Sequence, residues 1–186
     1  MNKETCNIIL IGMPGSGKST VGVKLAEMLS YEFVDTDVLI EALQGRSLQD
    51  IVNQEGHMAL RKIEEEFLLS FDFSKHVVAT GGSAVYSQPA MEHLKTNGVI
   101  TFLDVDLETL KSQIHNFGER GIARRPGQSL EDLYNERFPL YVRTADITIH
   151  SARLTPEEVC EKIVNQLEQE WGKNRFIRRT RAWRYE

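Results

Sequence analysis

The sequence has very few cysteines and no long apolar run. Its only two cysteines, Cys6 and Cys160, are far apart and stand outside any cluster of metal-ligating residues. This scarcity excludes a disulfide framework and a cysteine-based zinc site, and it favours a reducing, cytoplasmic compartment. No stretch stays apolar for the ~20 residues that a membrane-spanning helix needs, so we expect no membrane segment.

A strong charge of one sign is also missing. The 186 residues carry a net charge of −5, and six of the 22 lysines and arginines lie in residues 172–186. The body is therefore acidic, which argues against a general nucleic-acid-binding role. The length fits one domain over residues 1–171, followed by a basic extension over 172–186, and we expect a monomer. The extension could be a surface tail or a docking arm for a partner.

Short β-branched runs recur along the chain and predict strands. They lie at residues 7–11, 32–34, 76–79, 98–103 and 145–149. Helix-like stretches separate most of them, and two of these stretches have clear periodicity. The apolar residues that share a face are Val21, Leu25, Met28 and Leu29 in one helix and Val159, Ile163 and Leu167 in another. The alternation predicts an α/β fold with a central parallel sheet of about five strands between helical layers.

A glycine-rich loop between the first strand and the next helix is the strongest local signal. It fits the pattern G-x-x-x-x-G-K-[S/T] with Gly12, Met13, Pro14, Gly15, Ser16, Gly17, Lys18 and Ser19. The amides of such a loop fold around phosphate oxygens, and the helix dipole adds to their attraction. We expect Lys18 to reach the β- and γ-phosphates of ATP and Ser19 to ligate Mg²⁺, with Thr20 beside them. An incidental turn explains the glycines but not the lysine and serine at fixed offsets.

Two carboxylates follow the second predicted strand, at Asp35 and Asp37. The carboxyl ends of parallel strands form the edge at which open α/β sheets bind ligands. One carboxylate could hold the water shell of Mg²⁺, and the other could accept the proton of an attacking hydroxyl. Taken alone, the pattern fits equally well a turn that caps the next helix.

Three weaker signals come later in the chain. Arg61 and Glu64 are three residues apart on a predicted helix, so they can pair on one face. Gly81 and Gly82 end the third strand, where they indicate either a tight turn or a close approach of backbone to ligand. Residues 116–129 are rich in glycine and arginine and predict a mobile loop.

In this order the residues resemble the shikimate kinase family of P-loop small-molecule kinases. The matching motifs, between residue 7 and about residue 169, are the phosphate loop, Asp35-Thr36-Asp37, residues 56–64, Gly81-Gly82-Ser83, Arg125-Pro126 and Arg137 to Tyr141. The resemblance implies a P-loop NTPase-type α/β/α domain that transfers the γ-phosphoryl group of ATP to a hydroxyl of shikimate. It also implies an acceptor-binding region at about 35–64 and a lid at about 116–129.

The resemblance further implies roles for particular residues. Asp37 would contact the ring hydroxyls and act as the base or beside it, and Asp35 would support Mg²⁺ through water. The acceptor's carboxylate would be held by Arg61 and Arg137, whose guanidiniums match its geometry, and by the amide of Gly82.

Arg125 of the lid would close over the phosphates and, with Lys18, stabilise the charge in transfer. Leu60 and Ser83 depart from the family pattern, and both could reshape the acceptor pocket. Two alternatives therefore stay open: a kinase of a related hydroxy acid or sugar acid, and a divergent nucleotide-binding regulatory protein.

Overall fold

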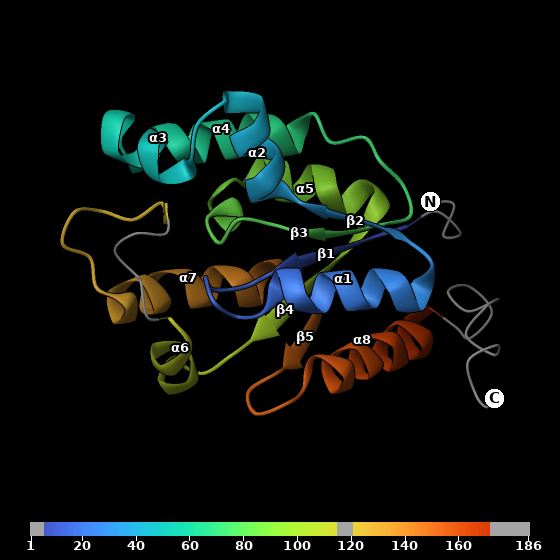
Figure 1. The fold of residues 1–186 in the computed structure, drawn as a ribbon. Coiled ribbons are helices and arrows are strands. Elements are labelled where there is room, and N and C mark those ends of the chain that lie inside the picture. The colour runs from blue at the N-terminus through green and yellow to red at the C-terminus, as the bar shows by residue number, and fades with distance from the viewer. Residues whose placement is uncertain (1–5, 115–120, 172–186) are drawn as a thin grey trace.

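A five-stranded parallel sheet forms the centre of the protein (Figure 1). The structure is a computed structural model and describes residues 6–114 and 121–171. The strands are β1 (Asn7–Ile11), β2 (Glu32–Asp35), β3 (His76–Ala79), β4 (Gly98–Asp104) and β5 (Ile147–His150). Their order across the sheet is β2-β3-β1-β4-β5, and every pairing is parallel, as the sequence predicted.

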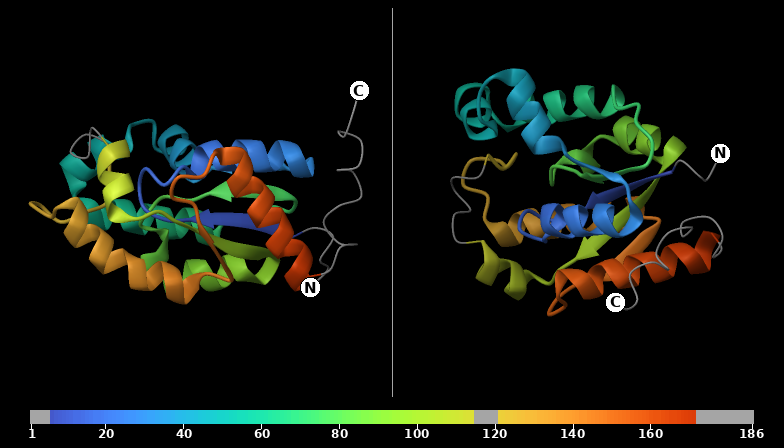
Figure 2. Two further views of the ribbon diagram at one scale, coloured as in Figure 1. Left: turned by 90° about the horizontal axis from the view of Figure 1, so that it is seen from below. Right: turned by 45° about the vertical axis from the view of Figure 1, so that its right-hand side comes forward.

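Helices cover both faces of this sheet. They are α1 (Lys18–Leu29), α2 (Thr36–Gln44), α3 (Leu48–Glu55), α4 (His57–Leu69), α5 (Gln88–Asn97), α6 (Leu107–Gln113), α7 (Leu130–Thr144) and α8 (Pro156–Trp171), with a short 3₁₀ helix, η2 (Ala84–Tyr86). Figure 2 shows α1 and α8 on one face and α5 and α7 on the other. The three-layer α/β/α arrangement is thus confirmed.

The buried central strand β1 explains how the layers are held together. Successive side chains of a strand point to opposite faces, so Ile8 and Leu10 pack with α1 and α8, whereas Ile9 and Ile11 pack with α5 and α7. All of these side chains are fully buried. Each contributes roughly 1.5–3 kcal/mol by its removal from water, which fixes the strand that carries the glycine-rich loop.

Some details differ from the sequence-based prediction, whereas the state of the cysteines does not. Met28, expected on the apolar face of α1, is 39% exposed, because it lies at the edge of the stripe formed by Val21, Leu25 and Leu29. The last strand begins at Ile147 rather than at residue 145, and it extends to His150. Cys6 and Cys160 are both buried, without a disulfide between them.

The loop and tail regions are described only in part. Residues 121–129 contain neither helix nor strand, in agreement with the predicted loop. The first part of the predicted lid, at 116–120, and the basic extension at 172–186 lie outside the described residues. Over the described ranges, no helix has both the length and the apolar character needed to cross a membrane.

Candidate active site

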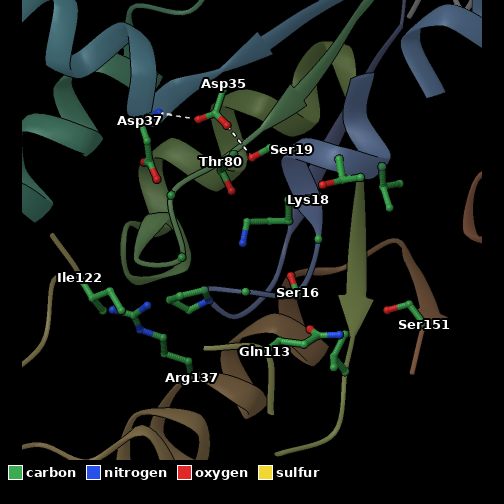
Figure 3. A pocket seen from close by; sticks show the side chains of 18 of the residues that line it. Ser16, Lys18, Ser19, Asp35, Asp37, Thr80, Gln113, Ile122, Arg137 and Ser151 are labelled. Atoms are coloured by element: carbon green, nitrogen blue, oxygen red, sulfur yellow. Dashed lines mark hydrogen bonds between the residues drawn. The ribbon is translucent and has the colours of Figure 1, made fainter. Parts of the chain in front are cut away.

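A cavity of about 840 Å³ opens at the carboxyl edge of the sheet (Figure 3). The loop after β1, the start of α2 and the turn after β3 all contribute to its wall. This is the edge at which parallel α/β sheets bind ligands, because the strand ends and helix N-termini converge there. The predicted site residues that line it are Pro14, Gly15, Ser16, Gly17, Lys18, Ser19, Thr20, Asp35, Asp37, Gly82 and Arg137.

The glycine-rich loop is folded in a way that only glycine tolerates. Gly12, Gly15 and Gly17 have φ of 149°, 81° and 85°. A Cβ on Gly12 would lie 2.8 Å from the carbonyl oxygen of Leu103, so the loop packs directly on β4. Ser16 Oγ is buried in this loop without a hydrogen-bond partner. A buried polar group left unsatisfied costs about 1–3 kcal/mol, and an anion bound in the loop would remove that cost.

The side chain of Lys18, the first residue of α1, folds back onto the glycine-rich loop. Its Nζ donates hydrogen bonds to the carbonyl oxygens of Gly12 and Met13 at 3.0 and 2.9 Å. Burial lowers the pKa of Lys18 to about 8, although the charges of Asp37 and Asp35 act in the opposite direction. The ammonium is therefore mostly charged at neutral pH, and it lies between the loop and the carboxylates in Figure 3.

Asp35 serves two partners at once. Its Oδ1 accepts a hydrogen bond from the backbone N–H of Asp37 at 3.1 Å and so caps α2, as one reading of the sequence proposed. Its Oδ2 accepts from Ser19 Oγ at 2.6 Å. The paired hydroxyl and carboxylate are hard oxygen donors of the kind that Mg²⁺ prefers. Since the described residues contain no cluster of three or more metal-ligating side chains, a metal here would need further oxygens from water or phosphate.

Asp37 has a free acceptor on the cavity wall. Its Oδ1 is buried and has no hydrogen-bond partner. Burial, with help from the charge of Asp35, raises the pKa of Asp37 to about 6, and Lys18 opposes this shift. At neutral pH the side chain is thus mostly an unpartnered carboxylate. Such a group is suited to accept a hydrogen bond from a hydroxyl beside the phosphate loop.

The two glycines after β3 are explained by close approach rather than by an unusual turn. A Cβ on Gly81 would lie 2.7 Å from Asp37 Oδ1 and would also strike the carboxylate of Glu64. A Cβ on Gly82 would lie 2.8 Å from Arg137 Nη1 and 3.0 Å from Pro14 Cδ. Because these two glycines lack side chains, their backbone can approach the cavity-lining residues Asp37, Glu64 and Arg137 closely.

Glu64 and Arg137 line the cavity beside these glycines. Burial raises the pKa of Glu64 to about 7, although the hydrogen bond that it accepts from Ser83 Oγ lowers it. Arg137 is only 1% exposed, and its Nη2 donates to the carbonyl oxygen of Ala123 at 2.7 Å. A fixed, buried guanidinium of this kind is a ready partner for a ligand carboxylate.

Arg61 is not among the residues that line the cavity. Its guanidinium lies over the ring of Tyr86, 3.4 Å from the centroid, and its Nη2 is 3.7 Å from Glu136 Oε1. The predicted pairing with Glu64 is therefore wrong: the carboxylate of Glu64 accepts from Ser83, and Arg61 pairs with Glu136 instead.

Arg125 is also outside the cavity wall. Its side chain is 65% exposed, and its Nη2 donates to Glu136 Oε2 at 2.5 Å. Arg61 and Arg125 thus both pair with Glu136. The structure brings Lys18, Asp37 and Arg137 together but leaves these two arginines next to, rather than inside, the site.

Sequence reasoning missed the far end of the cavity. There the wall is formed by Val105, Thr109, Gln113, Ser151, Arg153, Leu154, Pro156 and Val159. These residues follow β4 and β5 and match no short motif, so only their position after strand ends could have marked them. The mixture of apolar and polar groups would suit a nucleobase whose phosphates lie in the loop.

A phosphate-binding loop after the first strand, an aspartate beside it and a buried arginine across the cavity define a P-loop kinase of small molecules. Comparison with known proteins gives the particular family. The family model described as shikimate kinase matches residues 14–168. The chain belongs to the shikimate kinase family.

Individual relatives agree with this assignment. A protein of Sulfurihydrogenibium sp. named shikimate kinase is 36% identical over 164 residues, which are 88% of this chain and 98% of the relative. A solved structure described as shikimate kinase from Acinetobacter baumannii in complex with shikimate superposes with a TM-score of 0.80 at 31% identity, covering 91% of this chain and 96% of the other. The solved structure of shikimate kinase from Aquifex aeolicus superposes with a TM-score of 0.76 at 32% identity, covering 90% of this chain and 99% of the other.

Proposed function

We propose that this protein transfers the γ-phosphoryl group of ATP to a ring hydroxyl of shikimate, giving shikimate 3-phosphate, a step of aromatic amino acid biosynthesis. The observation that carries the proposal is the unpartnered, buried Oδ1 of Asp37 on the wall that also holds Lys18 and Arg137. A hydroxy acid fits these groups, because the carboxylate can take a hydroxyl hydrogen while the guanidinium pairs with the acid. Relatives named shikimate kinase support this choice of acceptor.

The phosphate end of the reaction is assigned to the loop after β1. Its amides and the Ser16 hydroxyl hold the phosphates of ATP, and Lys18 neutralises the β- and γ-phosphates. Ser19 would bind Mg²⁺ directly and Asp35 through water. The metal, when bound, supplies positive charge that offsets the charge of the phosphates. The remaining contacts to ATP are assigned to Gly12, Pro14, Gly15, Gly17 and Thr20.

The acceptor end is assigned to Asp37 and the groups across the cavity. Asp37 accepts the hydrogen of the attacking hydroxyl and orients its oxygen toward the γ-phosphorus. Arg137 and the Gly82 amide hold the acid group of the acceptor, with Arg61 as a second cation. Because a carboxylate and a hydroxyl on one ring are held at separate points, a single orientation is selected.

Arg125 is assigned to the closed state of the lid. It would leave Glu136 and approach the phosphates, where it stabilises the charge in transfer and helps to exclude water. Catalysis would then rest on Lys18, Asp37 and Arg125.

We also infer a monomer that acts in the cytoplasm on a small molecule and binds no nucleic acid. Size-exclusion chromatography with light scattering tests the monomer.

A coupled assay of ADP release with shikimate and a panel of hydroxy acids and sugar acids tests the proposed function. We expect shikimate to stimulate ADP release above the rate seen with ATP alone, and EDTA to abolish the stimulation. Turnover of another acid without response to shikimate would overturn the choice of acceptor. Binding of ATP with no phosphorylated acceptor at all would overturn the kinase assignment.

A further inference from the structure

Tyr86 lies between the two arginines assigned to the acceptor's acid group. It is the last residue of η2 (Ala84–Tyr86), which follows the glycines after β3. The guanidinium carbon of Arg61 is 3.4 Å from the centroid of its ring, and that of Arg137 is 5.3 Å away. A guanidinium stacked on an aromatic face is attracted by the negative charge of that face, and more strongly where water is excluded. One aromatic side chain therefore contacts both cations.

The hydroxyl of Tyr86 links Arg137 to Glu136 by hydrogen bonds. It accepts from Arg137 Nε at 3.3 Å and donates to Glu136 Oε1 at 2.5 Å. Glu136 in turn accepts from Arg125 at 2.5 Å and from Gln128 Nε2 at 2.7 Å. Glu136 is thus a protein carboxylate that pairs with Arg61 and Arg125 in the way a bound acid would.

Arg61 depends on Tyr86 because its expected neighbour is engaged elsewhere. Ser83 donates to Glu64, the carboxylate that the helical spacing would offer to Arg61. Arg61 Nε is buried without a hydrogen-bond partner, and the side chain is 18% exposed. The ring below the guanidinium and the 3.7 Å pair with Glu136 are what hold it near the cavity. A long side chain positioned in advance loses less conformational freedom when its ligand binds.

We propose that Tyr86 is a positioning residue for the carboxylate of the acceptor. Its ring supports Arg61 and its hydroxyl orients Arg137, while Glu136 pairs with Arg61 until an acid displaces it. The proposal deepens the function proposed above and rests on it. Tyr86 is not among the residues that line the cavity, so we expect its effect to be confined to recognition of the acid.

The test compares Tyr86→Phe and Tyr86→Leu with the wild-type enzyme in steady-state kinetics. Loss of the ring in Tyr86→Leu is expected to raise the KM for shikimate about tenfold, as a loss of about 1.4 kcal/mol does. Tyr86→Phe keeps the ring and loses only the hydroxyl contacts, so we expect an increase of about threefold. The KM for ATP should stay within about twofold of the wild-type value in both variants.

The methyl ester of shikimate provides a charge-specific control, because it lacks the acid that the arginines bind. Its binding to the enzyme with ADP, measured by calorimetry, should differ little between wild type and the two variants. A general disturbance of the pocket would weaken both ligands alike, and so would overturn the inference. The isosteric Tyr86→Phe, with its melting temperature checked, covers the case in which Tyr86→Leu folds poorly.

The outcomes separate the two proposals. A wild-type enzyme that does not phosphorylate shikimate overturns the proposed function. A wild-type enzyme that does so, with Tyr86 variants whose KM for shikimate is unchanged or rises together with the KM for ATP, overturns the role of Tyr86 alone. An increase confined to shikimate, and larger in Tyr86→Leu than in Tyr86→Phe, supports it.

Discussion

Replacing Asp37 by asparagine should stabilise the fold at alkaline pH while it removes activity. The pKa of Asp37 is about 6 in the folded protein against an ordinary value of 3.8, mainly because of burial. An acid with a raised pKa binds its proton more tightly in the folded state. Its ionisation therefore destabilises the fold increasingly as pH rises from about 4 to about 6, and fully above that. A shift of about 2 units corresponds to about 3 kcal/mol.

The amide of the substituted side chain cannot ionise, so Asp37→Asn should be more stable than wild type by up to about 3 kcal/mol at pH 8. For a protein of 186 residues this equals an increase in Tm of roughly 6–12 °C. The difference should disappear near pH 4, where the wild-type carboxyl is protonated in the folded state. Activity should fall by about 10²–10⁴, because the acceptor of the hydroxyl proton is gone.

Denaturation curves at pH 8 and pH 4, together with the ADP-release assay, measure both effects. Asp72→Asn is the matched control, since Asp72 is exposed in the segment between α4 and β3 and is not among the residues that line the cavity, so the substitution should change stability little at either pH. The reasoning is refuted if Asp37→Asn is no more stable than wild type at pH 8, or if it gains the same stability at both pH values.

Three further substitutions test neighbouring parts of the site. Ser83→Ala should raise the pKa of Glu64 above its value of about 7, because the hydrogen bond from Ser83 lowers that pKa; ¹³C NMR titration of the carboxyl measures it, and a lower pKa would contradict the account. Gly81→Ala would place a Cβ 2.7 Å from Asp37 Oδ1, so kcat should fall at least tenfold, about 1.4 kcal/mol in the barrier; an unchanged kcat would mean that Asp37 need not stay in place. Arg61→Ala should raise the KM for the acceptor about tenfold or more and leave the KM for ATP nearly constant; equal effects on the two would exclude Arg61 from binding the acid.

The sequence predicted the sheet and the phosphate loop well because their signals are local. β-branched runs ended by glycine mark buried strands, and the loop needs glycines at three backbone positions with φ of 149°, 81° and 85°. Helix α7 is harder to predict, since Pro139 removes one backbone hydrogen bond and would usually end a helix. Burial of Leu133, Arg137 and Tyr141 along one face of α7 compensates for that loss.

The arrangement around the arginines could not be predicted in the same way. The spacing of Arg61 and Glu64 favours a pair on one helix face, but Ser83, from a distant turn, engages Glu64 instead. Tyr86 and Glu136 come from different elements, and neither belongs to a short motif that would link it to Arg61. Such contacts are set by tertiary packing, which sequence periodicity does not encode.

The most direct test of the account is a crystal structure of the enzyme with ADP and shikimate. We predict a ring hydroxyl within hydrogen-bonding distance of Asp37 Oδ1 and the acid group of shikimate paired with Arg137. A shikimate bound elsewhere, or one whose hydroxyls all face away from Asp37, would contradict it.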